Sequence, residues 1–176
     1  MPPGTAIALS AGTTTCMLAA LLLDVPGLTV VTNSVPVADV IYRSGHTDQT
    51  LILTGGVRTP SDALVGPVAD RAIATVNLDL LFLGVHGMDP RAGFTTPNLA
   101  EAETNRAFVA QAERVVVVAD HTKWRTIGLH TIAPLSAAHV VVSDELLEPE
   151  AQTALRRHVG RLLIAVSLEA ELSHLA

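Results

Sequence analysis

The chain has 176 residues, of which 49% are hydrophobic, 3% are aromatic and 16% are charged, and its formal net charge is −6. A chain of this length can bury the core of one domain, and that core must consist mainly of Ala, Val, Leu and Ile. The acidic balance argues against a chain that grips nucleic acid by itself. The single cysteine, Cys16, excludes an internal disulfide and a paired-cysteine metal site.

The sequence also shows no membrane or export signal. No apolar run reaches the roughly 18 residues that a membrane-spanning helix needs. The N-terminus has no basic region before its apolar stretch, so it does not resemble a signal peptide. We therefore expect a soluble cytoplasmic protein.

The first predicted strand, residues 6–9, leads through a polar loop into a helix. Gly12 in that loop lets the backbone come close to a ligand. Three consecutive threonines, residues 13–15, place hydroxyls at the positive end of the predicted helix, where an anion is favoured. The alternative is that a threonine simply caps an ordinary strand-to-helix turn.

Further along the chain, predicted strands and helices alternate. Strands are expected at residues 28–31, 49–54, 80–83, 115–118, 140–142 and near 162–166, and helices at about 36–44, 68–76, 98–112 and 149–159. Residues 84–96 form the longest irregular stretch, which we expect to be a functional or mobile loop. The alternation predicts an α/β, Rossmann-like layered fold with a mostly parallel sheet flanked by helices, in a single domain over residues 1–176.

Small polar residues and glycines follow five consecutive predicted strands. The candidate binding residues at these ends, together with two threonines that close the long loop, are Ser10, Gly12, Thr13, Thr14, Thr32, Asn33, Gly55, Gly56, Arg58, Gly84, His86, Gly87, Thr95, Thr96, Asp120 and Lys123. Turns favour such residues anyway, but ligands of parallel sheets bind beyond the carboxyl ends of strands. We therefore expect one shared binding cleft.

The residue types in this expected cleft point to an anionic, hydroxyl-bearing ligand. Backbone N–H groups, hydroxyls, Arg58 and Lys123 suit a phosphate or carboxylate, and Asn33, His86 and Asp120 suit sugar hydroxyls. The motifs GxGxxG and GxxxxGK[ST] are both absent, which disfavours a dinucleotide or a nucleoside triphosphate. We expect neither a cofactor nor a metal.

Seven short motifs occur in an informative order. They are Ser-Ala-Gly-Thr-Thr-Thr at 10–15, Val-Thr-Asn-Ser-Val-Pro-Val-Ala at 31–38, Leu-Thr-Gly-Gly-Val-Arg at 53–58, Ala-Leu-Val-Gly-Pro at 63–67, Phe-Leu-Gly-Val-His-Gly at 82–87, Gly-Phe-Thr-Thr-Pro-Asn at 93–98 and Ala-Asp-His-Thr-Lys-Trp at 119–124. Together they resemble the C-terminal effector-binding domain of DeoR-type bacterial transcriptional regulators. The resemblance implies the fold of ribose-5-phosphate isomerases, glucosamine-6-phosphate deaminases and CoA transferases. It also implies a sugar-phosphate effector and a repressor role in sugar metabolism.

The chain departs from that family in three places. Family members carry an N-terminal winged helix-turn-helix before this region, and it is absent here, so we expect DNA contact only through that missing domain. The first loop often has Asp where this chain has Ser10. The helix after the long loop commonly reads Glu-x-Lys-Arg, whereas Asn105 stands here in place of the lysine, which could change the choice of effector.

Two classes of function remain open. The first is a regulatory sensor, expected to be a homodimer or a larger even-numbered oligomer, because regulators that read paired half-sites are commonly symmetric dimers. The alternative is a sugar-phosphate isomerase or deaminase, which needs a general base. The candidate bases are Glu101, Glu103, Asp89 and Asp120. Similar deaminases have Asp-Gly-His where Asp89 is followed here by Pro90, so we favour the sensor and expect no enzyme activity.

Overall fold

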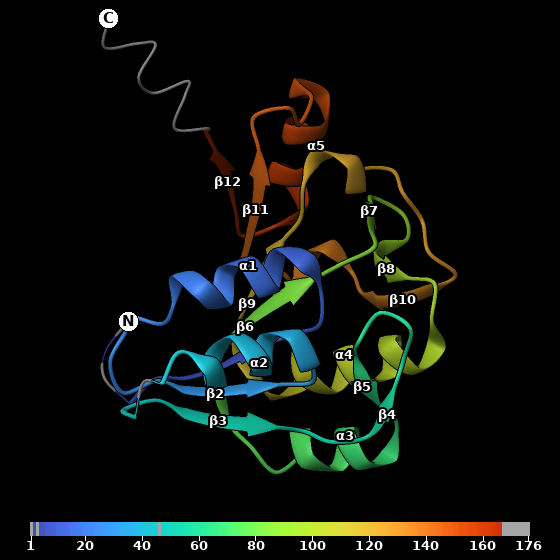
Figure 1. Ribbon diagram of the computed structural model, residues 1–176. Helices are drawn as coiled ribbons and strands as arrows, with labels where there is room; N and C mark the ends of the chain where they lie inside the picture. The colour runs from blue at the N-terminus through green and yellow to red at the C-terminus, as the bar shows by residue number, and fades with distance from the viewer. Residues whose placement is uncertain (1, 3, 46, 167–176) are drawn as a thin grey trace, which may run out of the picture.

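The computed structural model describes residues 2, 4–45 and 47–166. Seven parallel strands form the main sheet, in the order β12-β11-β9-β6-β1-β2-β3 (Figure 1). Their bounds are Ala6–Leu9 (β1), Thr29–Thr32 (β2), Thr50–Leu53 (β3), Leu78–Gly84 (β6), Ala112–Val118 (β9), Val140–Asp144 (β11) and Arg161–Ala165 (β12). The chain leaves the interior strand β1 first toward β3 and later, from β6, toward β12, so the direction of winding reverses between β1 and β6.

Helices cover both faces of this sheet, as the sequence predicts (Figure 1). Helices α1 (Thr13–Leu21) and α2 (Val35–Arg43) lie on one face, where Ile7 and Leu9 of β1 pack in a shared cluster with helix side chains. Helices α3 (Pro67–Ile73), α4 (Leu99–Gln111) and α5 (Pro149–His158) lie on the other face, in a cluster that includes Ala8. Successive residues of a strand point to opposite faces, which explains why Ala8 and its neighbours enter different clusters.

The predicted helices are confirmed to within a few residues at their ends. Ser34 and Asn98 cap α2 and α4, because their side chains accept hydrogen bonds from N–H groups of the first helical turn. Helix α5 begins at Pro149, has an acidic residue in its first turn and ends on Arg156, Arg157 and His158, which suits the helix dipole. None of the described helices is long and apolar enough to cross a membrane.

The prediction of an irregular loop over residues 84–96 is wrong. The segment contains strands β7 (Gly87–Asp89) and β8 (Gly93–Thr96), which form a hairpin and pair with β10 (His130–Ala133) in a small antiparallel sheet. Met88 and Phe94 of this hairpin are fully buried in the main core. Its turn is held by Asp89, whose Oδ1 accepts hydrogen bonds from the N–H groups of the two residues after Pro90. The hairpin therefore belongs to the packed structure.

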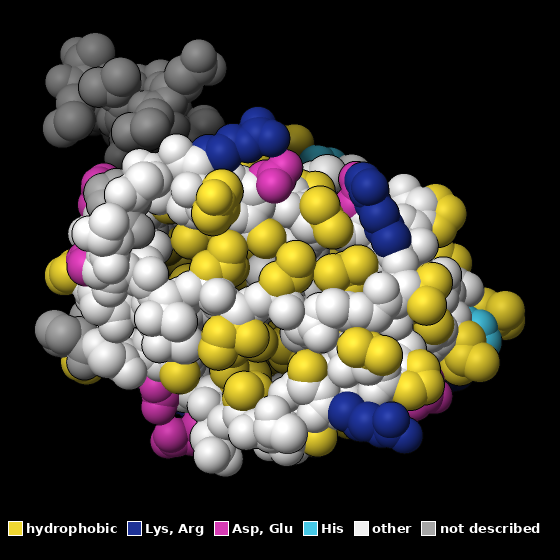
Figure 2. Space-filling view, turned by 60° about the horizontal axis from the view of Figure 1, so that its bottom comes forward, with side chains coloured by type: hydrophobic (Ala, Val, Ile, Leu, Met, Phe, Trp, Pro, Cys, Tyr) yellow, Lys and Arg dark blue, Asp and Glu magenta, His cyan; other side chains and the backbone are white. Residues whose placement is uncertain are grey.

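A second short ribbon and a hydrophobic surface lie at the β3 edge of the sheet. Strands β4 (Val57–Arg58) and β5 (Leu64–Val65) form the ribbon after β3. Hydrophobic side chains gather across the middle of the face that Figure 2 turns forward, with charged side chains toward its margin. The exposed hydrophobic residues of this region of the chain include Ile52, Leu53, Val57 and Val68.

Candidate functional site

A cavity of about 270 Å³ opens beyond the carboxyl ends of three adjacent strands, β1, β6 and β9. The loops that follow these strands form one part of its wall, and helix α4 supplies Glu101 and Asn105 to the wall as well. The position coincides with the reversal of winding between β1 and β6, which is where doubly wound sheets hold their ligands.

The loop after β1 brings the start of helix α1 to the cavity. Gly12, Thr13 and Thr14 line it, and no side chain caps the first turn of this nine-residue helix. The first N–H groups of a helix have no partner within the helix, and they carry its positive end. A phosphate or carboxylate in the cavity would therefore meet unused donors.

Buried side chains hold this loop in place. Ser10 is fully buried, and its Oγ accepts a hydrogen bond of 2.9 Å from the N–H of Gly84, which joins the loop after β1 to the end of β6. Asn33 accepts from the N–H of Ala11 at 3.1 Å through Oδ1 and donates to the carbonyl of Leu64 at 3.1 Å. These groups are committed to protein partners, so they position the cavity wall and do not line it.

Lys123 enters the cavity from the short 3-10 turn η1 (His121–Lys123) after β9. Asp120 caps this turn, because its carboxylate accepts from both the N–H and the hydroxyl of Thr122. Burial raises the pKa of Asp120, but the hydrogen bonds from Thr122 and the positive charge of Lys123 together lower it by more. The net pKa therefore lies below the ordinary value. Asp120 thus stays charged, and it shapes the turn that presents Lys123.

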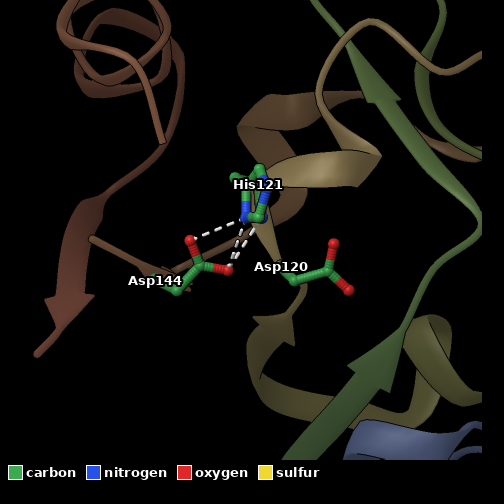
Figure 3. A group of neighbouring side chains, drawn as sticks. All are labelled: Asp120, His121 and Asp144. Atoms are coloured by element: carbon green, nitrogen blue, oxygen red, sulfur yellow. Dashed lines mark hydrogen bonds and ion pairs between the residues drawn. The ribbon is translucent and has the colours of Figure 1, made fainter. Parts of the chain in front are cut away.

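The same turn is joined to strand β11 by a hydrogen bond between the side chains of His121 and Asp144. Figure 3 shows the carboxylate of Asp144 facing the ring of His121, with Asp120 extending away from it. Asp144 also accepts a hydrogen bond of 3.0 Å from the backbone N–H of His121. These three residues offer ligand atoms that all lie within 4.8 Å of one another and are the one group among the described residues with the composition of a metal site. The carboxylate oxygens of Asp144 and Asp120 already accept hydrogen bonds from His121 and Thr122. The geometry therefore supports a structural role, and the His121–Asp144 contact is called the latch below.

Helix α4 supplies Glu101 and Asn105, which lie one helical turn apart and both line the cavity. Glu101 accepts hydrogen bonds through Oε1 from Thr59 at 2.9 Å and from Ser61, and through Oε2 from Thr96 at 3.3 Å. Asn105 is 9% exposed, and no described residue donates a hydrogen bond to its Oδ1. The cavity therefore has donors at the α1 side and acceptors at the α4 side.

The structure brings only part of the predicted binding set together. Seven of the residues line the cavity: Gly12, Thr13, Thr14, Gly84, His86, Thr96 and Lys123. Nine do not line it: Ser10, Thr32, Asn33, Gly55, Gly56, Arg58, Gly87, Thr95 and Asp120. The shared cleft thus draws on three strand ends, because the loops after β2 and β3 lie farther along the sheet.

The nine residues outside the cavity have identifiable structural roles or positions. Arg58 is exposed and pairs with Asp62 at 2.6 Å. Thr32 is buried and donates to the carbonyl of Leu9 at 2.7 Å. Thr95 accepts from the N–H of Gly128 at 2.9 Å.

Two of the glycines outside the cavity allow close backbone approach. A Cβ on Gly56 would lie 2.6 Å from the carbonyl oxygen of Val65, and a Cβ on Gly87 would lie 1.9 Å from the carbonyl oxygen of Thr126. A Cβ on Gly55 would make only an ordinary contact with Val68.

Sequence reasoning did not place Ser61, Glu101 and Asn105 in the binding set. Glu101 entered only as a candidate base of an enzyme, and Asn105 only as a departure from a family pattern. Their spacing of four residues on one helix is the signal that would have grouped them, because such residues share a helical face. Which face meets the cavity is decided by tertiary packing.

The amino-acid sequence matches the family described as DeoR C terminal sensor domain over residues 1–145. It is 34% identical over 150 residues to the HTH-type transcriptional regulator GlpR of Haloferax volcanii, which covers 85% of this chain and 58% of that protein. It is 28% identical over 145 residues to the glycerol-3-phosphate regulon repressor of Escherichia coli K12, which covers 82% of this chain and 57% of that protein. The chain thus spans less than two thirds of the length of these relatives.

The fold is similar to that of a solved enzyme structure. Ribose 5-phosphate isomerase A from Methanocaldococcus jannaschii superposes with a TM-score of 0.50 at 12% sequence identity, over 70% of this chain and 48% of that chain. The expected likeness to ribose-5-phosphate isomerases is therefore confirmed for the fold. At this identity the likeness says nothing about activity.

Proposed function

The chain belongs to the family of DeoR C-terminal sensor domains, and from that membership we propose that it senses a sugar phosphate, or a related small anion, for a repressor of sugar metabolism genes. The effector would occupy the cavity beside α1, without a cofactor or a metal. Because such a regulator acts on bacterial DNA, we place it in the cytoplasm.

One observation carries this proposal: the uncapped start of α1 and the basic residue Lys123 line the same cavity. A phosphate there would accept hydrogen bonds from backbone N–H groups and from a charged donor at once. The hydroxyl-bearing part of a sugar would then extend toward acceptors on α4. One relative is named for the glycerol-3-phosphate regulon, which agrees with a phosphorylated effector.

Isothermal titration calorimetry tests the proposal directly. We expect ribose 5-phosphate, glucose 6-phosphate or glycerol 3-phosphate to bind, and the corresponding unphosphorylated compounds to bind at least about tenfold more weakly, because charged hydrogen bonds are worth about 1.5–3 kcal/mol. Equal binding of a sugar and its phosphate ester would contradict a phosphate site beside α1.

DNA recognition in this proposal belongs to a winged helix-turn-helix domain that precedes the sensor domain in the regulator. The sensor chain itself carries 17 acidic and 11 basic residues, so its own field opposes contact with a polyanion. Effector binding would act on DNA affinity by favouring one arrangement of the two domains, to the extent that the ligand binds that arrangement more tightly.

We further propose that the domain forms a homodimer or a larger even-numbered oligomer through the β3 edge. Among the described strands β3 pairs only with β2, so one side of its backbone is open to another strand. Leu53 at the end of β3 is 45% exposed, and Val57, four residues later, is 71% exposed. Light scattering at micromolar concentration should give an even multiple of 18.4 kDa. Val57→Lys should lower the mass, whereas Leu129→Lys, which alters a residue 82% exposed in the segment before β10, should not.

A further inference from the structure

Asn105 is a buried polar group without a matching partner. Its side chain lies on α4, is 9% exposed and lines the cavity, and its Oδ1 receives no hydrogen bond from any described residue. Folded proteins leave very few such acceptors unsatisfied, because burial removes the water that would otherwise bond them. The exception therefore needs a cause.

The adjacent residue shows that α4 otherwise satisfies its buried polar groups. Thr104 is fully buried, and its hydroxyl donates to Asp70 of α3 at 2.6 Å and accepts from the N–H of Gly66 at 3.4 Å. Thr104 thus joins α4 to α3, whereas Asn105 belongs to the cavity wall. Oδ1 itself has almost no exposed surface, so a ligand in the cavity supplies the missing donor once the Asn105 amide turns its oxygen toward the cavity.

The charge around Asn105 limits what that ligand can be. Glu101, one turn earlier on the same helix, is a carboxylate in the same cavity wall. The basic residue Lys123 comes from the turn after β9, and the uncapped start of α1 is another part of the same cavity wall. A second phosphate directed at α4 would meet the carboxylate of Glu101, and like charges in a confined site repel. The cavity volume of about 270 Å³ also lies just below the roughly 300–1,000 Å³ that is common for ligand sites.

We infer that Asn105 binds a hydroxyl group of the effector, and that the site accepts a sugar monophosphate and rejects a sugar bisphosphate. The hydroxyl donates to Oδ1 and can accept from Nδ2 of the same amide. This inference rests on the proposed function, because it places the single phosphate at the α1 end of the cavity. It adds that a hydroxyl group of the ligand lies at the α4 end of the cavity, and it names Asn105 as the residue that binds this hydroxyl.

The decisive variant is Asn105→Leu, which keeps the size of the side chain and removes both its donor and its acceptor. Wild type and variant are titrated by calorimetry with ribose 5-phosphate, glucose 6-phosphate, inorganic phosphate and fructose 1,6-bisphosphate. We expect the best-bound monophosphate to lose about 3- to 10-fold in affinity, as one neutral hydrogen bond predicts. Inorganic phosphate should bind both proteins equally, because it does not reach α4.

Thermal unfolding of the ligand-free proteins separates a binding role from a structural one. Since Asn105→Leu removes an unsatisfied acceptor, the variant should unfold at the same temperature as wild type or higher. A lower unfolding temperature together with an equal loss of affinity for inorganic phosphate and for the sugar phosphate would show that Asn105 supports the fold, and would overturn the inference.

The remaining outcomes distinguish the inference from the function on which it rests. If wild type binds a sugar monophosphate and Asn105→Leu binds it equally well, or if the bisphosphate binds wild type more tightly, the inference alone is wrong. If wild type binds neither inorganic phosphate nor any phosphate ester, the phosphate site itself is wrong and the inference is overturned with it.

Discussion

The Nδ1 atom of His121 lies 2.9 Å from Oδ1 of Asp144. This contact links the turn that presents Lys123 to the end of strand β11, two strands away from the loop after β6. The turn that carries the cavity's lysine is therefore held by a side-chain hydrogen bond that lies outside the cavity.

We expect stability in acid to depend on the Asp144 carboxylate of this contact. Burial raises the pKa of Asp144, but three hydrogen bonds together lower it by more: those from the His121 ring, the His121 backbone N–H and the Leu146 backbone N–H. The net pKa therefore lies below its ordinary value of 3.8. A carboxyl with a lowered folded pKa stabilises the protein above its unfolded pKa, and this contribution is lost as the pH falls through the folded value. The urea concentration at the unfolding midpoint should therefore decrease as the pH falls below about 4. The decrease should be less steep for Asp144→Asn than for wild type.

A loss of one negative charge anywhere could change acid stability slightly. Asp48→Asn, which alters an exposed residue before β3, provides the control for that effect. Identical pH profiles for Asp144→Asn and Asp48→Asn would show that the latch contributes nothing to stability in acid.

Lys123 should contribute strongly to phosphate binding, and Arg58 should not. Lys123→Gln removes the charged donor from the cavity, and we expect affinity for inorganic phosphate or a sugar phosphate to fall about tenfold or more. Arg58→Gln is the matched control, because Arg58 is exposed and pairs with Asp62 outside the cavity. Calorimetry at fixed salt measures both. An equal loss in the two variants would mean that long-range charge, and not contact, drives binding.

The sequence predicts the parallel sheet well because the information is local. Runs such as Val115–Val118 are short, apolar and β-branched, and capping residues such as Ser34 and Asn98 mark helix starts. Gly12 and Lys123 could be assigned to a cleft because the carboxyl ends of neighbouring parallel strands meet at one edge.

The rest depends on contacts between distant segments. The hairpin strands β7 and β8 are three and four residues long, too short to show a period of their own, and are defined by pairing with β10. Ser10 and Asn33 have the same chemistry as binding residues, but their partners are Gly84, Ala11 and Leu64. Local sequence cannot show whether a polar side chain at a strand end turns toward a ligand or toward a neighbouring loop.

Gly93 should be essential to the hairpin. Its φ is +74°, and a Cβ there would lie 2.3 Å from the carbonyl of Ala133. Gly93→Ala should destabilise the fold by about 2–5 kcal/mol, the sum of backbone strain and overpacking. Gly45→Ala has a similar φ of +71° with nothing within 4 Å, so it isolates the strain. Urea unfolding should show the larger loss for Gly93→Ala, and equal losses would remove the close approach as a cause.

We expect the protein to bind sugar phosphates without converting them. Isomerisation and deamination need a base that is free to reach the substrate. Asp89 holds its own turn, Asp120 holds Thr122, and Glu103 pairs with Arg106 at 2.6 Å. Among the candidate bases only Glu101 lines the cavity, and both of its oxygens already accept hydrogen bonds from hydroxyl groups.

A site of this kind stabilises a bound sugar phosphate and its transition state about equally, which gives affinity without rate. Ribose 5-phosphate and glucosamine 6-phosphate, each in large molar excess over the protein and followed by NMR, should therefore be recovered unchanged. Product formed over many turnovers would contradict the sensor function. Loss of that activity in Glu101→Gln but not in Glu103→Gln, which alters an exposed residue of the same helix, would then identify Glu101 as the base of an enzyme.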